Sequence, residues 1–478
     1  MIKFKQINKL LFLLALAVFS ACQNNEVDPD EETGSDSDYQ SVNTWIYEVM
    51  NDAYFWYKQM PASTTLDAKS NPTDYFEKLV YQRTTTDRFS MVTDDTDELQ
   101  NSFDGISKIF GISYSISYID NTNTSVGLFL NYVVNGSPAA NAGLKRGDII
   151  LKANGTQLTR DNYSSLLSGS ETLTFTLGTV NGSMISAGSS TVSVTKAVVT
   201  EDPVAFSTVI DKSAYGKKIG YIVYTQFVPG IDGNDSKYDN ELRQIFADFK
   251  SQGVNELVLD LRLNSGGYIS SATTLASLIG KSVSGSKVFY REQWNDKYVA
   301  YWQKQYGSSA LDYPFQNEAN NIGGNISRVF VLTSQGTASA SELVINGLKP
   351  YMDVVTIGDH TAGKNLFGSL ISDDQGRWKW GLYIMLGQTA NANGESDYGT
   401  VNGMTPVYQV ADNLLPYKPF GDDNEPLFSK ALSVMGIPIS TNARTASGRT
   451  ASAVVAGSFR DNLQVTESRM IKTSLRER

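Results

Sequence analysis

The 478-residue chain contains one cysteine, Cys22, and one histidine, His360. A single cysteine excludes an intramolecular disulfide, and a single histidine leaves no second imidazole for acid–base chemistry. The chain has 40 Lys and Arg against 50 Asp and Glu, which gives a formal net charge of −10. Because affinity for nucleic acid comes mainly from clustered basic side chains, this balance disfavours a nucleic-acid partner. With 41% hydrophobic residues, the composition is otherwise that of a folded protein of two or three domains.

The sequence also lacks a long apolar run near its beginning. The run Leu10–Phe19 is too short to cross a bilayer comfortably, follows three lysines and precedes Ser20-Ala21-Cys22. That order is typical of a secretion signal that ends in a lipidation site. We therefore predict that residues 1–21 are a lipoprotein signal peptide and that Cys22 is lipidated; a buried free thiol is the alternative. The expected location is the bacterial cell envelope, lipid-anchored in the outer membrane and facing either the periplasm or the surface.

Residues 22–40 are acidic and carry almost nothing to bury, which predicts a solvated tether. Apolar residues then recur at helical spacing after Ser41, the expected N-cap, and a second short helical pattern opens at Asn71-Pro72. We predict an N-terminal helical domain at residues 41–104, in which the aromatic side chains serve packing rather than ligand binding.

Residues 105–200 alternate short strand patterns with glycine turns, which predicts a small β-rich domain. Within it, the run Gly136–Ile150 and the turn Asn154-Gly155 resemble the most recognisable segment of a PDZ domain. Four residues upstream lie where PDZ domains place the loop that binds a peptide carboxylate: Phe110, Gly111, Ile112 and Ser113. The resemblance implies that a peptide adds to this domain as an extra strand; a degenerate domain that serves only as a spacer or lid is the alternative.

Beyond residue 200, apolar strand patterns such as Arg328–Thr333 alternate with helical patterns such as Asn240–Ser251. This alternation predicts an α/β core with a mixed, largely buried sheet and flanking helices at residues 201–440. The expected fold is therefore an α/β core with a small β-rich PDZ domain and an N-terminal helical cap. Residues 441–478 are rich in Ser, Thr, Ala and Arg with weak periodicity, so we expect a low-complexity tail that is poorly ordered or loosely docked.

A serine-rich turn separates the strand Arg328–Thr333 from the helical pattern that follows. It places Ser339 at a strand-to-helix junction, where a hydroxyl is exposed and helix-terminal amides face a developing negative charge. Such a position suits a nucleophile. Ser339 and Glu342 also have the spacing of a capping box, and the segment taken alone favours a helix cap.

Two further segments favour a catalytic role for Ser339 over a role as a helix cap. The loop Gly358–Lys364 follows the next strand, and Asp260–Gly267 ends an earlier one. With the Ser339 turn they resemble the C-terminal processing peptidases, also called tail-specific proteases. That family's signature has a serine and a lysine on two such segments, and Ser339 and Lys364 are separated by 25 residues, as in the family. The resemblance covers roughly residues 41 to 435 and includes three shorter segments: Asp87–Ser90, Lys218–Ile222 and Gly403–Pro406.

The resemblance implies a serine endopeptidase with a Ser339–Lys364 dyad that uses no metal and no other cofactor. A serine hydroxyl needs an adjacent base, and a lysine acts as base only when neutral, a state that burial favours. Asp260 and Arg262 are predicted to be a structural pair at the end of a buried strand. Backbone amides would stabilise the oxyanion, the candidates being those of Ala340, Gly266 and Gly267.

The sequence does not identify what positions the lysine. Some family members carry an acidic residue eleven positions after the nucleophile and a glutamine four after the lysine, but this chain has Pro350 and Gly368 there. The hydrogen bonds that support Lys364 must then come from elsewhere. His360 is a rival base, disfavoured because a lone histidine in a surface loop is seldom catalytic.

The preferred function is therefore an envelope endopeptidase that receives an unfolded or C-terminally exposed protein segment with the help of the PDZ domain and cuts it. Its expected partners are protein or peptide substrates and, through Cys22, a membrane. The alternative is a catalytically silent scaffold that only binds peptides, against which the intact Ser339, Lys364 and paired glycines argue. A Ser–His hydrolase of a non-peptide ester is a third hypothesis, opposed by the absence of a second histidine.

Overall fold

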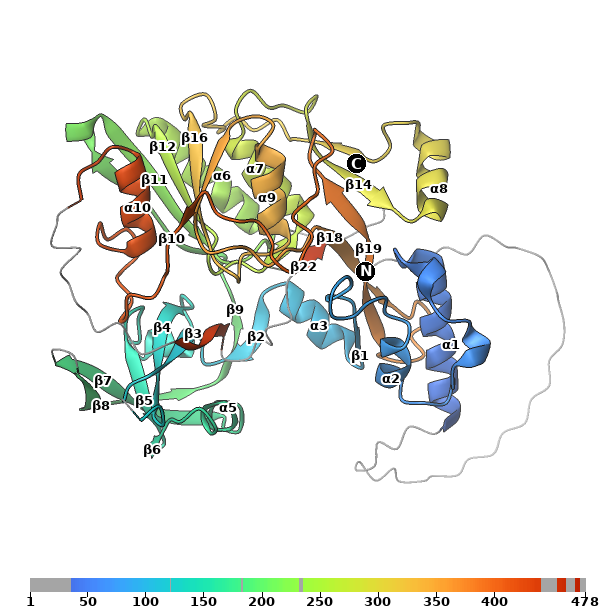
Figure 1. Cartoon of the computed structure of the whole chain (residues 1–478), viewed down its shortest axis with the longest axis horizontal. Helices are drawn as coiled ribbons and strands as arrows, with labels where there is room; N and C mark the ends of the chain where they lie inside the picture. Colours follow the sequence, from blue (N-terminus) through green and yellow to red (C-terminus); the bar gives the residue numbers. More distant parts are fainter. Residues whose placement is uncertain are drawn as a thin grey trace, which may run out of the picture.

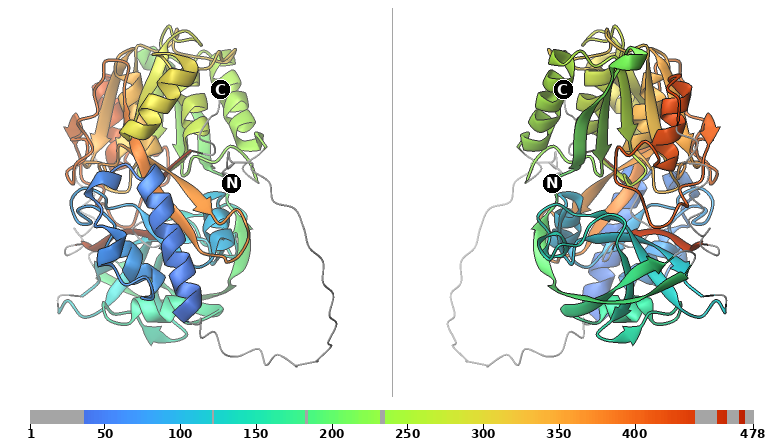
Figure 2. Two further views of the ribbon diagram at one scale, coloured as in Figure 1. Left: turned by 90° about the vertical axis from the view of Figure 1, so that its right-hand side faces the viewer. Right: turned by 90° about the vertical axis from the view of Figure 1, so that its left-hand side faces the viewer.

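The computed structural model describes residues 36–120, 122–181, 184–231, 235–439, 454–460 and 469–472. Figure 1 shows an α/β body, a small β domain and a helical unit, coloured green to orange, teal and blue respectively. In the side views of Figure 2, the β domain and the helical unit both lie below the α/β body, and Figure 1 shows them at opposite ends of the molecule.

The centre of the α/β body is a six-stranded sheet in the order β10-β11-β12-β16-β17-β20. Neighbouring strands from β11 to β20 are parallel, and β10 is an antiparallel edge strand. The central strands are buried on both faces, as expected of parallel strands with apolar runs. The bounds are β10 (Val204–Lys212), β11 (Lys217–Tyr224), β12 (Glu256–Asp260), β16 (Arg328–Thr333), β17 (Asp353–Gly358) and β20 (Tyr408–Gln409).

Helices cover both faces of this sheet (Figure 1). On one face, α6 (Lys237–Ser251), α7 (Ile269–Ile279) and α9 (Ala340–Leu348) share one large apolar cluster with the strands. On the opposite face, α10 (Pro426–Val434) brings Phe428 against Tyr221 and Phe330. The predicted α/β core with a buried sheet is confirmed.

A second sheet connects the α/β body to the helical unit. Its order is β13-β22-β18-β19-β14-β15, with β1 added to β19. α8 (Asp296–Tyr306) follows β14. The strand bounds are β1 (Met91–Thr93), β13 (Gly266–Tyr268), β14 (Val288–Trp294), β15 (Asp312–Pro314), β18 (Leu366–Ser372), β19 (Gly381–Ala390) and β22 (Arg469–Ile471). Because β13 holds the paired glycines and β18 starts just after Lys364, this sheet borders the predicted site.

The β domain contains a sheet in the order β21-β3-β4-β5-β7-β8, with β6 paired to β5. Two short helices, α4 (Pro138–Asn141) and α5 (Tyr163–Ser168), add to its apolar cluster. A separate pair, β2 (Ile106–Ile109) and β9 (Ala197–Thr200), joins the ends of the domain. The expected β-rich domain is confirmed. Its strand bounds are β3 (Ile112–Tyr118), β4 (Val126–Val133), β5 (Ile149–Ala153), β6 (Thr156–Gln157), β7 (Thr172–Asn181), β8 (Met184–Thr195) and β21 (Val454–Arg460).

The helical unit contains α1 (Asp36–Ala53), α2 (Pro72–Glu77) and α3 (Thr96–Phe103). The second helix starts as predicted, since the Asn71 side chain accepts the amide hydrogen of Thr73 and Pro72 is the first helical residue. The prediction for the first helix needs a correction. Ser41 lies inside α1 and is not its N-cap, because the polar residues before it continue the helix.

Two strands come from the segment expected to be a loosely docked tail. β21 pairs with β3, and β22 lies between β13 and β18. That expectation therefore does not hold for residues 454–460 and 469–472, whose partners lie far away in the sequence and leave no local signal. The other tail residues, the predicted signal peptide and most of the tether lie outside the described residues.

None of the helices in the described part of the chain is both long and apolar enough to cross a membrane.

Candidate active site

Ser339 stands between β16 and α9, where the chain turns sharply. Its backbone has φ 63° and ψ −110°, a combination that non-glycine residues rarely adopt. The side chain is fully buried, and Oγ has no hydrogen-bond partner among the described residues. Ser339 is the N-cap of α9, and its amide donates to Glu342 as in the predicted capping box. Because its hydroxyl is left unpaired at the helix N-terminus, the position also suits a nucleophile.

The Glu342 carboxylate joins the serine turn to the lysine loop. Its Oε2 accepts the amide hydrogens of Ser339 at 2.7 Å and Lys364 at 2.8 Å. Its Oε1 accepts the Gly363 amide at 2.8 Å and the Thr361 hydroxyl. Burial raises the pKa of Glu342, while these hydrogen bonds act in the opposite direction. One buried side chain therefore fixes the backbone on both sides of the site.

The Lys364 side chain is fully buried. Its Nζ donates a hydrogen bond to the Tyr383 hydroxyl at 3.3 Å and lies 4.8 Å from the centre of the Phe89 ring. The Tyr383 ring centre is 5.1 Å from the same atom. The two rings restrict where the amine can lie.

Tyr383 supplies support that the sequence left unidentified at Pro350 and Gly368. Pro350 lies just beyond the C-cap of α9. At Gly368, a Cβ would come within 2.6 Å of the Ile384 carbonyl oxygen, so a glutamine side chain does not fit without movement. Nothing in the local sequence around Tyr383 pointed to this role, whereas Phe89 belongs to a segment that the resemblance had singled out.

The turn after β12 packs directly against the serine turn. The Asn264 carbonyl oxygen accepts the Ala338 amide and the Ser341 hydroxyl, both at 3.1 Å. The Thr337 hydroxyl donates to the Leu261 carbonyl at 2.8 Å. Ser341 is thereby engaged in holding the two turns together.

The three predicted oxyanion donors differ in their surroundings. The Gly266 amide donates to Asn264 Oδ1 at 2.8 Å, so it is committed to the turn. Gly267 has φ 137°, and a Cβ there would lie 2.1 Å from the Phe227 carbonyl oxygen, so only glycine fits. Ala340 is the first residue of α9, and its amide is one of the initial helix donors. Gly267 and Ala340 therefore remain the stronger candidates.

Arg262 forms the predicted structural pair with Asp260 and extends it. The guanidinium contacts Asp260 at 2.9 Å, Glu425 at 2.6 Å and Asp412 at 3.0 Å. Its side chain is only 2% exposed. This buried network fixes the base of the turn that carries the paired glycines.

Arg88 connects the helical unit to the lysine loop. Its guanidinium donates to the carbonyl oxygens of Ala362 at 3.1 Å and Gly363 at 2.9 Å. The next residue is Phe89, whose ring lies beside the amine of Lys364. The helical unit thus contributes directly to the site.

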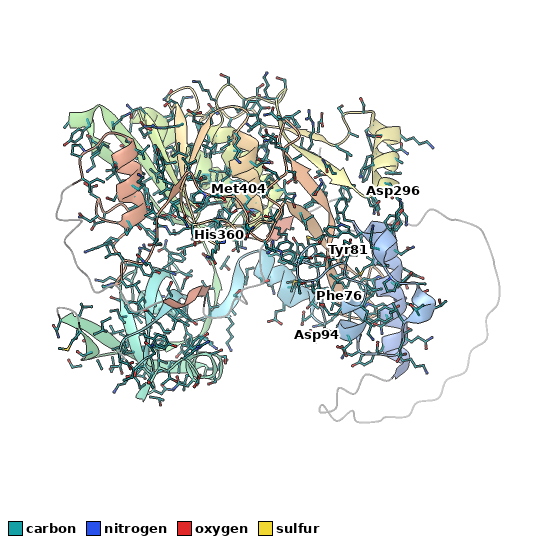
Figure 3. The ribbon with its side chains drawn as sticks, viewed as in Figure 1. Phe76, Tyr81, Asp94, Asp296, His360 and Met404 are labelled. Carbon is teal, nitrogen blue, oxygen red and sulfur yellow. The ribbon has the colours of Figure 1, made fainter. Side chains whose placement is uncertain are left out.

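His360 lies close to the lysine loop but differs from Lys364 in exposure. Its side chain is 37% exposed, and Nδ1 lies 2.9 Å from Asp359 Oδ1. The neighbouring Thr361 amide donates to the Met404 carbonyl at 3.1 Å, which places His360 and Met404 near each other in Figure 3. This exposed pair favours Lys364 over His360 as the base.

The four residues predicted to bind a peptide carboxylate come together at the start of β3. Phe110 is buried, and Ile112 and Ser113 open the strand. Gly111 has φ 93°, and a Cβ there would overlap the Ser137 side chain at 2.1 Å. β3 is already paired with β21 of the same chain.

Among the described residues, no group of three or more His, Cys, Asp and Glu side chains could hold a metal ion. Cys22 lies outside the described residues, so its lipidation stays a prediction.

Three family models match the chain. The model of peptidase family S41 matches residues 218–407, that of the peptidase S41 N-terminal domain residues 41–91, and that of a PDZ domain residues 129–178. The matched models define the class as a peptidase of family S41 that carries a PDZ domain. Residues 218–407 and 41–91 match models of peptidase family S41, which confirms the predicted resemblance to the C-terminal processing peptidases.

Relatives and a solved structure agree with this assignment. The chain is 28% identical over 249 residues to a carboxyl-terminal-processing protease of Synechocystis and 30% identical over 240 residues to that of Picosynechococcus. These matches cover 50% and 49% of this chain, and the chain spans about half the length of these curated relatives, 51% and 50%. A crystal structure from Bacteroides fragilis assigned to the S41 proteases has a TM-score of 0.70 at 28% identity, covering 87% of this chain and 99% of that one.

Proposed function

We propose that the protein is a serine endopeptidase of the bacterial envelope, with Ser339 as nucleophile and Lys364 as general base. The observation that carries this proposal is the Glu342 carboxylate, which accepts hydrogen bonds from the amides of both residues. Because this one buried carboxylate binds both the serine turn and the lysine loop, it fixes their relative position. A reaction that needs a nucleophile beside a base requires such a fixed arrangement. A scaffold that only binds peptides has no use for this arrangement.

The mechanism follows from ordinary acyl transfer. The neutral Lys364 amine removes the Ser339 hydroxyl proton while Oγ attacks the carbonyl carbon of the peptide bond. Backbone amides of Gly267 and Ala340 stabilise the oxyanion. The Lys364 ammonium then returns its proton to the leaving amine, and water hydrolyses the acyl-enzyme with Lys364 again acting as base. Each of these steps uses only groups of the chain, the substrate and water.

The substrate is an unfolded or C-terminally exposed segment of a protein. Two features support this: a PDZ domain, whose relatives bind peptides as added strands, and an α/β core from a family with carboxyl-terminal-processing proteases. The envelope location rests on the sequence alone, with Cys22 as the lipidated residue that anchors the chain to a membrane.

The test compares four versions of the chain from residue 23 onward: unaltered, Ser339→Ala, Lys364→Ala and His360→Ala. Each is incubated with an unfolded protein substrate and a metal chelator, and fragments are identified by mass spectrometry. Cleavage should be lost in the serine and lysine variants and kept in the histidine variant, the matched control. Full activity of Lys364→Ala would end this mechanism, and peptide binding without cleavage by the unaltered chain would favour the scaffold.

A further inference from the structure

A short strand from the tail lies inside the second sheet, next to the reacting groups. β22 runs parallel to β13, with Gly266 opposite Arg469, Gly267 opposite Met470 and Tyr268 opposite Ile471. On its other side it meets β18, where the Lys472 amide donates to the Gly368 carbonyl at 3.0 Å. β22 therefore fills the space between the strand with the paired glycines and the strand that follows Lys364.

The backbone of Met470 reaches the group that supports the base. The Tyr383 hydroxyl donates to the Met470 carbonyl at 3.1 Å and accepts the Met470 amide at 3.3 Å. The same hydroxyl accepts a hydrogen bond from Lys364 Nζ. A peptide backbone is thus held at the proposed catalytic centre, with its Met470 residue opposite the proposed oxyanion donor Gly267.

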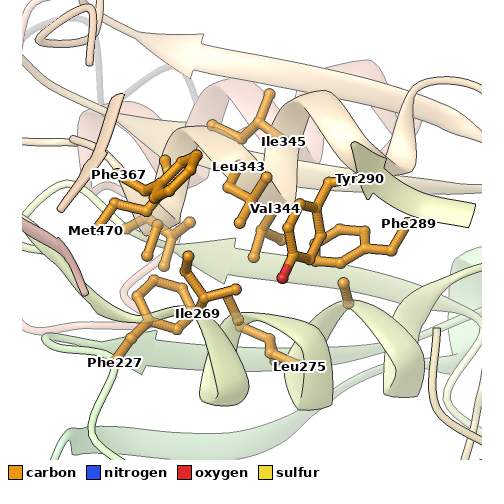
Figure 4. Packing of buried hydrophobic residues seen from close by; sticks show 14 of the residues in the cluster. Phe227, Ile269, Leu275, Phe289, Tyr290, Leu343, Val344, Ile345, Phe367 and Met470 are labelled. Atoms are coloured by element: carbon orange, nitrogen blue, oxygen red, sulfur yellow. The ribbon is translucent and has the colours of Figure 1, made fainter. Parts of the chain in front are cut away.

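The side chains of this strand enter pockets of two kinds. Met470 is fully buried in the large apolar cluster, beside Phe367 and near Phe227 and Ile269 in Figure 4. Ile471 is buried with Tyr268 in a second apolar cluster. Two successive side chains of a strand point to opposite faces, so both faces of the channel are apolar at this point.

The next residue enters a charged pocket. Lys472 Nζ lies 2.6 Å from Glu292 Oε1 and 3.0 Å from the Tyr313 hydroxyl, and only 5% of the Lys472 side chain is exposed. Trp294 Nε1 donates to the other Glu292 oxygen at 2.8 Å. Burial lowers the pKa of Lys472, but the Glu292 carboxylate outweighs it and the pKa stands above its ordinary value. A buried carboxylate with one oxygen already held is a site shaped for a basic side chain.

The second tail strand occupies the edge of the PDZ domain. β21 pairs antiparallel with β3, with Arg460 opposite Ser113, in the position where a peptide would be added. The tail therefore contacts both the β3 edge, where the PDZ domain is expected to bind substrates, and the space between β13 and β18, where the substrate is expected to be cut.

We propose that the channel between β13 and β18 binds a substrate strand with a large apolar side chain opposite Gly267 and a lysine two residues later, and that Glu292 and Tyr313 form the subsite for this lysine. The tail occupies the channel in cis as a mimic of that substrate and competes with external peptides. The inference rests on the proposed function, because it specifies the substrate of the same site.

The test is a charge swap in the full chain. Peptide binding is measured by fluorescence anisotropy in a Ser339→Ala background, with a peptide copying residues 466–475 and a second peptide carrying Glu in place of its lysine. Lys472→Glu should expel the tail and tighten binding of the lysine peptide about tenfold. Glu292→Lys should also expel the tail and reverse the preference, binding the Glu peptide about tenfold better than the lysine peptide. In the variant that combines Lys472→Glu with Glu292→Lys, the two charges pair again and hold the tail in place. This variant should bind both peptides as weakly as the chain without either substitution.

Glu292→Gln serves as a second variant because it keeps an acceptor for Trp294 while removing the charge, and thermal unfolding checks that each variant folds. Its expected result is loss of the preference for lysine. If the swaps leave the ratio of the two affinities unchanged, Glu292 is not a specificity subsite; if Lys472→Glu binds no tighter, the tail is a structural strand only. Cleavage of the lysine peptide by the Ser339-containing chains is read separately, so its complete absence would overturn the proposed function without deciding the binding result.

Discussion

Lys364 Nζ donates a hydrogen bond to the Tyr383 hydroxyl at 3.3 Å, within a pocket that excludes solvent. Tyr383 lies on β19, and the hydroxyl comes from the strand adjacent to the one that follows the lysine. The position at which some family members carry a glutamine is Gly368, which has no room for a side chain. The lysine is therefore supported from a neighbouring strand instead of from its own.

Removing the Tyr383 hydroxyl should impair the chemical step more than binding. We expect Tyr383→Phe to lower kcat at saturating substrate by about tenfold, the order of a lost hydrogen bond. The melting temperature should also fall, because the same hydroxyl bonds the Met470 carbonyl and amide. Tyr47→Phe is the matched control, because its hydroxyl bonds the Pro61 carbonyl in the helical unit. An unchanged kcat in Tyr383→Phe would show that the hydroxyl does not position the base.

The Glu342 carboxylate should be sensitive to loss of one acceptor oxygen. In Glu342→Gln, an NH2 group replaces one of the two carboxylate oxygens, and the hydrogen-bond donors that faced this oxygen lose their acceptor. We therefore expect kcat/KM to fall about a hundredfold or more and the free energy of unfolding to fall by about 1–3 kcal/mol. Steady-state kinetics and urea unfolding measure the two effects. Glu98→Gln, a change at an exposed glutamate, should alter neither. Normal kinetics in Glu342→Gln would contradict the role assigned to this side chain.

A methyl group at Gly267 should block the oxyanion turn. Gly267→Ala brings Cβ to 2.1 Å from the Phe227 carbonyl oxygen, whereas a Cβ added at Gly253, also at positive φ, would meet no atom within 4 Å. We expect Gly253→Ala to cost about 1 kcal/mol of stability with full activity, and Gly267→Ala to lose activity about a hundredfold or more. Equal activities of the two variants would exclude Gly267 from the site.

The Arg262 network should make stability depend on pH through Glu425. Burial raises the pKa of Glu425, but the Arg262 guanidinium outweighs it and holds this pKa below its ordinary value. A lowered pKa contributes stability that is present above the ordinary value and lost as pH falls through the folded-state pKa. Glu425→Gln should therefore be less stable than the unaltered protein at pH 7, and the difference should shrink below about pH 4. A difference that grows in acid, measured by denaturant unfolding, would contradict this sign.

Much of the core could be predicted because its signals are local. The strand Arg328–Thr333 has the predicted bounds, and the expected helix after the serine turn begins at Ala340. Continuous apolar runs and glycine turns identify such elements without knowledge of their partners. The same holds for Ser339 and Lys364, whose segments carry a recognisable spacing.

The rest depended on contacts between distant residues. Tyr383 has no motif around it, and its role exists only because β18 and β19 pair. The strands β21 and β22 lie in a segment with weak periodicity. β21 pairs with β3, and β22 lies between β13 and β18, so both depend on strands from distant parts of the chain. Glu342 was visible as a capping residue, but its bonds to the lysine loop required the fold.

Because Arg88 contacts the lysine loop, the geometry of the site depends on two segments that are synthesised at different times. Arg88 lies 274 residues before the Ala362 carbonyl that it binds, so the helical unit leaves the ribosome long before the loop does. The loop gains its guanidinium clamp, and Lys364 its Phe89 neighbour, only after both parts have folded and met. A chain that lacks the helical unit therefore loses both the guanidinium that holds this loop and the aromatic ring beside the Lys364 amine.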